Sequence, residues 1–177
     1  MRLFQEQGDV LYASLVVSAL EAVILPQGDE EMAHSLYEQS LPLLRASKDR
    51  GRLGMILIKV GDIWLHQYGG EQQAKMLYQQ GLNLWQDMQR VDNGLGIVRG
   101  LAGMAEVAAA QGQAERAGRL FGAADRLLPV ASLYRDDLNR RVAEARTHLD
   151  VAAFTTGWTT GQAMTQEQAV TDALQDA

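Results

Sequence analysis

Few residues in this sequence have the types and the spacing that catalysis requires. The three histidines, His34, His66 and His148, lie far apart along the chain, and none belongs to an H-E-x-x-H motif. The sequence contains neither the G-x-x-x-x-G-K-[ST] phosphate loop nor the G-x-S-x-G turn of a serine nucleophile. Without cysteine there is no thiolate zinc site, no thiol nucleophile and no disulfide framework. We therefore expect no catalytic residue, no metal and no cofactor.

Asp62 and His66 are four residues apart, so on a helix they share one face and could form a hydrogen-bonded pair. A zinc site needs three or four ligands, and two side chains do not supply them. We interpret the pair as structural or solvated.

The charge of the chain argues against nucleic acid as a partner. Its formal net charge is −6, whereas a general nucleic-acid binder needs Lys and Arg to displace the counterions of phosphates. One basic run is interrupted by Asp49 and carries no interleaved aromatic residue; it consists of Arg45, Lys48, Arg50 and Arg52. Cations suit a helix C-terminus, so we interpret this run as a solvated helix end.

Neither a membrane span nor a signal peptide is expected. The most apolar window, residues 15–25, is about half the length of about 20 residues that a span needs. The N-terminal stretch MRLFQEQGD lacks an apolar signal region. We expect a soluble, cytoplasmic chain.

The strongest pattern is an internal repeat, in which a glycine precedes an alanine by five residues and an aromatic residue by nine. The three copies are Gly28, Ala33 and Tyr37; Gly69, Ala74 and Tyr78; and Gly112, Ala117 and Phe121. The alanines are spaced by 41 and 43 residues, and a second set of glycines, Gly8, Gly51 and Gly94, is spaced by 43. Two marker sets therefore agree on the period.

Each repeat predicts two helices joined at a glycine. The first helices are predicted at about 9–25, 52–68 and 95–111 and the second helices at about 30–46, 71–90 and 114–128. Helical spacing is clearest for the apolar residues Leu53, Leu57, Val60 and Trp64 and for Leu101, Met104 and Ala108. Gly28, Gly69 and Gly112 can adopt the left-handed conformation that ends a helix. We expect repeats over residues 1–128, in units of about 9–50, 51–93 and 94–128.

Three glycines lie inside the helix predicted at 95–111, the first helix of the third repeat, and their presence in a helix needs an explanation. Gly96, Gly100 and Gly103 share one helix face, and each costs the helix about 1 kcal/mol relative to alanine. We expect this face to pack closely on the backbone or bulky side chains of another helix. Five aromatic residues on apolar stripes are expected in the core: Trp64, Trp85, Phe121, Phe154 and Trp158.

The two ends of the chain differ from the repeats. Residues 129–177 are expected to form a connector and a C-terminal helical cap, with a helix from Tyr134 to Leu149 whose arginines face away from its apolar stripe. A capping box at Thr165 to Gln168 predicts a last short helix. Residues 3–8 look like the tail of a second helix without its partner, so we expect an apolar N-terminal edge that favours self-association.

The repeated unit resembles the tetratricopeptide repeat, with a glycine at the inner turn and A-x3-Y/F in the second helix. The usual period of that family is about 34 residues, so the resemblance implies a longer-helix form. HEAT-type repeats share the longer period but lack this register. The resemblance implies an all-α, right-handed superhelical stack of about three helical hairpins with a C-terminal helical cap.

The C-terminal part also resembles the C-terminal repeat region of large bacterial signalling proteins that carry an NB-ARC-type NTPase module. The similar stretches are GLAGMAEVAAAQGQAERAGRLFGAADRLL, RRVAEARTHLD and AFTTGWTTGQAMTQEQAV. This resemblance implies a sensor or autoinhibitory arm of a multidomain signalling or transcriptional regulator, whose NTPase and output domains are not in this chain.

In tetratricopeptide proteins the first helices line a groove that receives a peptide or a helix. Counting from the apolar register of residues 52–68 and 95–111, the partner-binding face would show Met55, Ile58, Lys59, Asp62, His66, Arg99 and Glu106, together with Ala102 and Ala109. Ser18 is a further candidate in the first repeat. This mixture of charges, Met and Ile suits a protein partner.

We therefore expect a non-catalytic protein–protein interaction module that binds a protein, a peptide or other domains of its parent protein. Two alternatives remain open. One is an effector sensor that encloses a small molecule in an apolar pocket with convergent polar groups. The other is a free-standing adaptor with an open groove.

Overall fold

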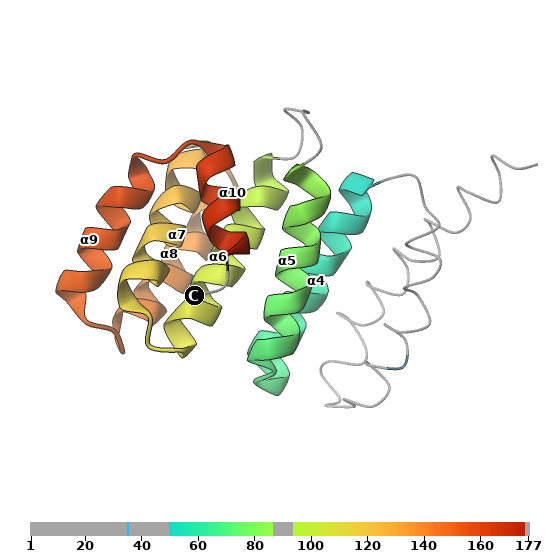
Figure 1. Cartoon of the computed structure of the whole chain (residues 1–177), viewed down its shortest axis with the longest axis horizontal. Helices are drawn as coiled ribbons and strands as arrows, with labels where there is room; N and C mark the ends of the chain where they lie inside the picture. Colours follow the sequence, from blue (N-terminus) through green and yellow to red (C-terminus); the bar gives the residue numbers. More distant parts are fainter. Residues whose placement is uncertain (1–34, 36–49, 87–93, 176–177) are drawn as a thin grey trace, which may run out of the picture.

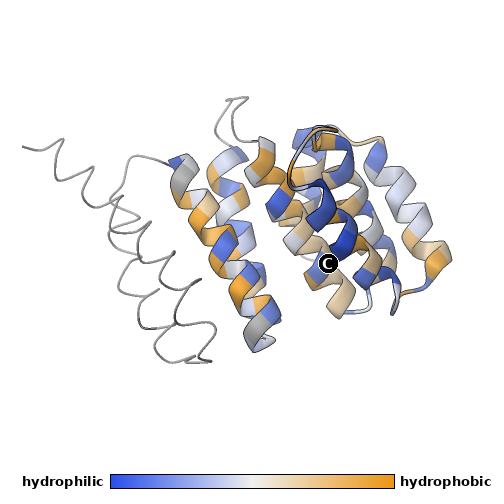
Figure 2. Cartoon of the chain, turned by 180° about the vertical axis from the view of Figure 1, so that it is seen from behind, coloured by the Kyte–Doolittle hydropathy of each residue, from blue (hydrophilic) through white to orange (hydrophobic). Residues whose placement is uncertain are grey.

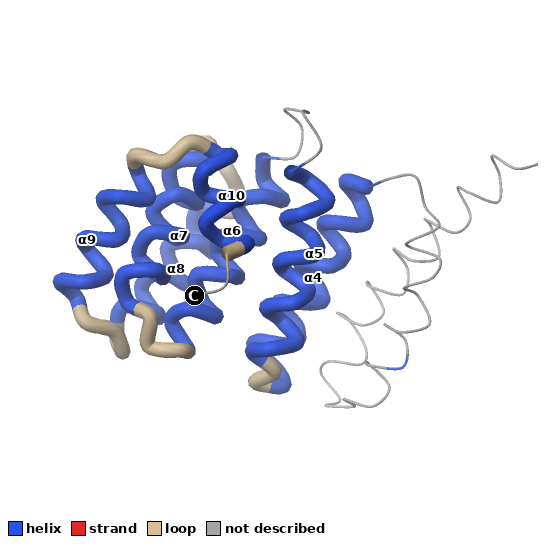
Figure 3. The backbone as a smooth tube through the Cα atoms, in the orientation of Figure 1, coloured by secondary structure: helices blue, strands red, loops and turns tan. Residues whose placement is uncertain are grey.

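The computed structural model describes residue 35 and residues 50–86 and 94–175 of the chain. These residues form seven helices and no strand, which confirms the all-α fold class for this part (Figure 3). The helices are α4 (Arg50–Tyr68), α5 (Glu71–Gln86), α6 (Gly94–Ala110), α7 (Ala114–Leu127), α8 (Arg135–Arg146), α9 (Val151–Gln162) and α10 (Gln166–Leu174). None of them combines the length and the apolar character that crossing a bilayer requires.

Several sequence predictions fall on residues outside this description. They are the helices at 9–25 and 30–46, the end of the helix predicted at 71–90, the glycine hinge Gly28, the candidate Ser18 and the N-terminal edge. The helices predicted at 52–68, 95–111 and 114–128 agree with α4, α6 and α7 to within two residues at each end.

Two of the predicted glycine hinges adopt the left-handed backbone conformation at the same place in their helix pairs. Gly69 has φ 62° after α4, and Gly112 has φ 73° after α6. The next amide donates back into the helix in both cases: Gly70 N–H to the Trp64 carbonyl at 2.9 Å and Gln113 N–H to the Ala108 carbonyl at 2.9 Å. These bonds satisfy carbonyl groups at the helix ends and turn the chain into α5 and α7.

Consecutive helices lie side by side across the molecule (Figure 1). α4 packs on α5, α5 on α6 and α6 on α7, while α9 makes its main contact with α7. α10 returns across α6 and contacts α5, α6 and α7. α6 is therefore the central helix, and it buries eleven of its 17 residues.

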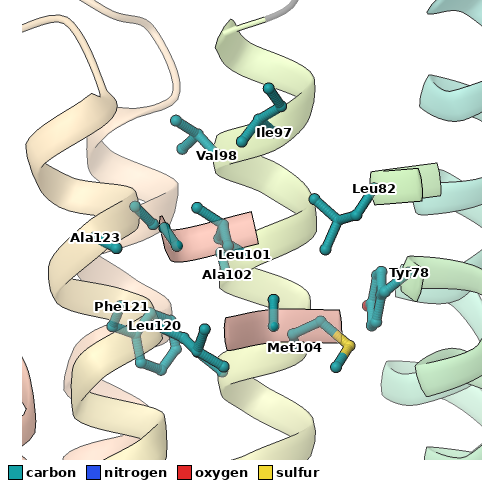
Figure 4. Packing of buried hydrophobic residues seen from close by; sticks show 14 of the residues in the cluster. Tyr78, Leu82, Ile97, Val98, Leu101, Ala102, Met104, Leu120, Phe121 and Ala123 are labelled. Carbon is teal, nitrogen blue, oxygen red and sulfur yellow. The ribbon is translucent and has the colours of Figure 1, made fainter. Parts of the chain in front are cut away.

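The hydrophobic core is centred on α6 (Figure 4). Leu101 and Met104 of α6 lie between Phe121 of α7 and Tyr78 of α5. A second cluster of buried apolar residues lies on the other side of α4, whose hydrophobic residues run along its length in Figure 2. Its members are Leu53, Ile56, Leu57, Val60 and Leu77.

Trp85 of α5 fits between glycines of its two neighbouring helices. A Cβ added at Gly54 of α4 would lie 2.7 Å from the indole, and one added at Gly96 of α6 would lie 2.4 Å from it. Both contacts are closer than a side chain allows, so only glycine leaves room for the ring. Trp85 is 2% exposed, as its predicted core position requires.

Tyr78 occupies a second slot two helical turns away. A Cβ at Gly61 of α4 would lie 2.7 Å from its ring, and one at Gly103 of α6 would lie 2.4 Å from it. Gly100, between these two levels, faces Leu82 in the same way at 2.7 Å. The expectation that Gly96, Gly100 and Gly103 admit bulky side chains of a neighbouring helix is confirmed.

α9 is attached to α7 by direct contact between the two backbones. A Cβ at Gly118 or Gly122 of α7 would lie 2.1 and 2.4 Å from the carbonyl oxygens of Phe154 and Trp158. In return, a Cβ at Gly157 or Gly161 of α9 would lie 1.9 and 2.0 Å from those of Glu115 and Arg119. Each helix thus presents a G-x-x-x-G stripe to the other. The sequence analysis did not identify this contact.

The helix boundaries in residues 129–175 differ from the sequence prediction. The helix expected from Tyr134 to Leu149 is shorter, and α9 begins at Val151 because Asp150 caps it by accepting from Ala153 N–H at 2.7 Å. The capping box of α10 at Thr165 is confirmed. Phe121 and Phe154 are buried as expected, and Trp64 and Trp158 are partly buried.

Candidate functional site

A buried arginine of α8 connects three helices. Arg141 is 5% exposed. Its Nη1 donates to Asp62 Oδ1 of α4 at 3.2 Å and to Glu106 Oε2 of α6 at 2.8 Å, and its Nε donates to Asp137 Oδ2 of α8 at 2.9 Å. We call the group around it the polar cluster; it consists of Asp62, His66, Tyr78, Arg99, Glu106, Asp137 and Arg141.

Two side chains from neighbouring helices hold Asp62 in place. The Tyr78 hydroxyl donates to Asp62 Oδ1 at 2.9 Å, and Arg99 Nη2 donates to Asp62 Oδ2 at 3.4 Å. Burial, and then the charge of Asp62, raises the pKa of Tyr78 well above its ordinary value, so the hydroxyl stays protonated and donates. The glycine slot around Tyr78 therefore positions a carboxylate at the surface of α4.

Glu106 contacts one residue of α4 and one of α8. His66 Nε2 lies 3.4 Å from Glu106 Oε2, the oxygen that also accepts from Arg141. The hydrogen bond with Glu106 raises the pKa of His66, although its partial burial acts in the opposite direction. The hydrogen-bonding partner of His66 is thus Glu106, whereas the sequence suggested Asp62.

Burial of Arg141 alone would lower its pKa, but the charges of Asp62 and Glu106 outweigh that effect and raise it. Burial alone would likewise raise the pKa of Asp137, yet the bond from Arg140 and the charge of Arg141 lower it. Asp137 and Arg141 are therefore both charged at neutral pH.

Tyr134, at the start of α8, lies against the same arginines. Its ring centroid is 5.3 Å from Arg99 Cζ and 5.9 Å from Arg141 Cζ, within the range of cation–π attraction. Tyr134 and Arg141 lie seven residues apart on one side of α8, so this side faces α6.

The polar cluster carries an excess of negative charge. It contains three carboxylates and two guanidinium groups, which leaves one net negative charge while His66 is neutral. Ligand atoms of Asp62, His66 and Glu106 lie within 4.8 Å of one another, a spacing that could suit a metal ion. Arg141 Nη1 lies between the two carboxylates, so we interpret the group as a cation-binding cluster that holds a guanidinium.

A hollow of about 660 Å³ opens beside the polar cluster. It lies where the C-terminal ends of α4, α6 and α8 meet. Its lining residues are the apolar Leu65, Ala109, Ala110 and Ala145 and the polar His66, Glu106, Arg141, Glu144, Thr147 and His148. Volumes of about 300–1,000 Å³ are usual for ligand sites.

The structure brings together four of the residues predicted to bind a partner: Asp62, His66, Arg99 and Glu106. Met55 and Lys59 of α4 are half-buried. The assignment of Ile58 to an accessible face is corrected, because Ile58 is fully buried and packs against Gly81 and Gly100. Ala102 is also fully buried, and Ala109 lines the hollow.

Arg141 is the residue that the sequence analysis missed. The apolar stripe of its helix placed the arginines on the solvent side, yet Arg141 is buried on α6. The charge of the predicted face gave no signal for a buried arginine, because Lys59 and Arg99 already balanced Asp62 and Glu106 in the sequence.

No family model, curated protein or solved structure matches the chain. Function is therefore inferred from the repeat pattern, the polar cluster and the hollow.

Proposed function

We propose that this chain is a non-catalytic helical-repeat module for protein–protein interaction, built as a right-handed, tetratricopeptide-like superhelical stack. Three features support the proposal. The repeat period is the same for two sets of markers, Gly69 and Gly112 occupy the same place in consecutive helix pairs, and the alanine–aromatic motif contributes core residues in both pairs.

The observation that carries the functional proposal is the docking of α8 on α4 and α6. A face that was predicted to receive a helix binds one from its own chain, through Arg141. The side chains at this contact are the predicted Asp62, Arg99 and Glu106, together with Tyr134 from α8. The same kind of contact serves recognition of a helix from another protein.

The saturation of the polar cluster supports a binding role over a catalytic one. Asp62 accepts from Tyr78, Arg99 and Arg141, and Glu106 contacts Arg141 and His66. A general base or a nucleophile needs a free lone pair directed at a substrate. Here both oxygens of Asp62 and Oε2 of Glu106 are engaged in contacts between helices.

On the resemblance of its C-terminal part, we further propose that the chain is the sensor or regulatory arm of a bacterial multidomain signalling or transcriptional regulator. A free-standing adaptor is the alternative. The DNA directly upstream of the Met1 codon tests this point. An NTPase module in the same reading frame supports the regulatory arm, and an in-frame stop codon supports the adaptor.

A small-molecule sensor is the second candidate, and the hollow is the observation that favours it. The hollow has the volume of a ligand site, and the polar residues His66, Glu106, Arg141 and Thr147 line it.

The experiment that separates these functions fills the hollow. Ala110 is exposed and lines it, so Ala110→Trp should occupy the hollow without touching the core. Ala152, exposed on α9, gives the matched control Ala152→Trp. Peptides are selected from a random 20-residue library on the immobilised chain, and their affinities for both variants are measured.

For an interaction module we expect peptides whose affinity falls at least about tenfold in Ala110→Trp and is unchanged in Ala152→Trp. Selected peptides that bind both variants equally, or a failure to select any, would contradict the proposal. A metabolite library screened by thermal shift on the same variants tests the sensor. A compound that stabilises the parent and Ala152→Trp but not Ala110→Trp would favour the sensor.

A further inference from the structure

We infer that α8 is a displaceable internal ligand, and that the face of α4 and α6 beneath it recognises an arginine-bearing helix of a partner protein. This inference rests on the proposed function and adds the chemistry of the partner. The partner helix would take the place of α8 and direct its arginine between Asp62 and Glu106.

The receptor for the arginine is built without α8. Asp62 is fixed by Tyr78, which is locked between Gly61 and Gly103. Glu106 of α6 is next to His66 of α4. These residues belong to α4, α5 and α6, which pack against one another through the hydrophobic core. The two carboxylates therefore remain in position when α8 leaves; Asp62 keeps Arg99, and Glu106 loses its guanidinium partner.

α8 is attached by few buried groups. Leu138 and Arg141 are its buried residues, whereas the neighbouring α7 buries eight of 14. Arg135, in its first turn, binds the Leu128 carbonyl at 2.7 Å and also pairs with Asp125, so the N-terminal end of α8 is tied to the end of α7. The remainder of α8 is held by Arg141, by the buried Leu138 with Val142 and Ala145 beside it, and by Arg146 over the Phe154 ring. Arg141 supplies its buried charged contacts, and we infer that α8 can detach when they are lost, while α9 stays on α7.

The partner needs an arginine and not simply a positive charge. Arg141 uses Nη1 for carboxylates of α4 and α6 and Nε for Asp137 of its own helix, so one guanidinium binds the receptor while α8 itself orients it. A lysine ammonium on a flexible stem cannot reproduce that planar fork. The pattern of α8 adds an aromatic residue seven positions before the arginine and a leucine three before it, as Tyr134 and Leu138 show.

The net charge of the receptor and the hollow beside it both favour binding of a partner helix after α8 has left. With Arg141 gone, the receptor residues Asp62, Glu106 and Arg99 carry one net negative charge, and Glu144 of the hollow leaves with α8. The hollow adjoins the arginine site and is open while α8 is docked. It offers the partner a first contact against Ala109 and Ala110 before α8 is displaced.

The test uses the full chain and a fluorescent peptide with the sequence of residues 133–149, LYRDDLNRRVAEARTHL. Two further peptides carry Gln or Lys in place of the arginine that corresponds to Arg141. Affinities are measured for the parent chain and for the chain with Arg141→Gln, whose own α8 is weakened. Circular dichroism checks that the variant keeps its helical content.

We expect the Arg141→Gln chain to bind the arginine peptide at least about tenfold more tightly than the parent does, because its internal competitor is weaker. We expect the Gln peptide to bind this variant at least about tenfold more weakly than the arginine peptide, with the Lys peptide between them. A folded Arg141→Gln chain that binds none of the three peptides, or binds all three equally, overturns the inference.

A second measurement does not depend on a variant. Amide hydrogen exchange of the parent chain is compared with and without millimolar arginine peptide. We expect faster exchange in α8 (Arg135–Arg146) and unchanged exchange in α9. Peptide binding that leaves the exchange of α8 unchanged overturns the inference.

The proposed function and the inference fail in different ways. Library peptides that bind at the hollow but show no need for arginine leave the interaction module intact and overturn the inference. If no selected peptide binds Ala110→Trp more weakly than the parent chain, the proposed interaction module is contradicted.

Discussion

The two helices α8 and α9 follow one another in the chain and are attached to the repeats by opposite means. α9 lies on α7 with glycine stripes on both helices, so that backbone meets backbone. α8 lies on α6 and α4 through Arg141, whose contacts are ion pairs and charge-assisted hydrogen bonds. The attachment of α9 depends on close contact between backbones, and the attachment of α8 depends on a charged side chain.

The difference teaches that the two helices respond to different conditions. The contact between α7 and α9 depends on shape, so substitutions that add atoms should break it. The contact of α8 depends on charge, so substitutions and pH changes that alter charge should weaken it. The following predictions test that contrast, beginning with the largest effect.

Gly157→Leu should have the largest effect, because any Cβ at this position meets the Glu115 carbonyl oxygen at 1.9 Å and neither backbone can move away cheaply. We expect a loss of about 3 kcal/mol in the free energy of unfolding, measured by urea denaturation. The control is Gly94→Ala, where an added Cβ has no neighbour within 4 Å. Its effect should stay within about 1 kcal/mol. Equal effects of the two substitutions would contradict the assigned contact.

Arg141→Gln should release α8 and leave α9 in place. Hydrogen bonds to charged groups contribute about 1.5–3 kcal/mol, so we expect amide protection in α8 to fall by about 2 kcal/mol. Hydrogen exchange read by mass spectrometry measures this loss helix by helix. Arg141→Lys should recover part of it by restoring the charge. Protection lost equally from α8 and α9 would show that the two attachments are one cooperative unit.

Tyr78→Phe should have a smaller effect, because it removes the hydroxyl that donates to Asp62 and keeps the ring in its slot. We expect a loss of about 1 kcal/mol in the free energy of unfolding. Tyr134→Phe is the matched control, since no described group hydrogen-bonds the buried Tyr134 hydroxyl. Thermal unfolding of the two variants should therefore differ, and a loss as large in Tyr134→Phe would contradict the assigned role of the Tyr78–Asp62 bond.

The smallest effect should be the contribution of His66 to pH dependence. Its pKa is raised above 6.5 in the folded chain, so its contribution to stability is complete below that pH and is lost as the pH rises through the folded pKa. Between pH of about 6 and about 8 the free energy of unfolding should fall by less than about 1 kcal/mol, because His66 is 41% exposed and solvent screens it. His66→Gln should abolish this component, and His148→Gln should retain it.

The sequence predicted α4, α6 and α7 and the turns after α4 and α6 well because their signals are local. Gly69 and Gly112 end helices through their own backbone conformations, and the capping box at Thr165 needs residues only three apart. The glycine face of α6 was also predictable, since glycines that cost a helix stability need a packing reason. These features depend on neighbours in the chain or on one helix face.

The contacts of the C-terminal helices were harder to predict because they join distant residues. Arg141 binds partners 79 and 35 residues before it, and the apolar stripe of its own helix indicated a solvent-facing position. The glycine stripes of α7 and α9 were visible in the sequence as G-x-x-x-G at Gly118 and Gly157. Glycines on one helix face indicate close packing there, as they did for Gly96, but they do not show which helix packs against that face.

The firm attachment of α9 determines how strongly an external helix must bind. α8 is tethered at both ends, by residues 128–134 to α7 and by residues 147–150 to α9. When Arg141 releases Glu106, it remains within reach of the receptor at an effective concentration on the order of millimolar. A free helix with the affinity of α8 would therefore have to reach that concentration to compete. A partner that acts at lower concentration has to add surface of its own, and the hollow is the nearest place to add it.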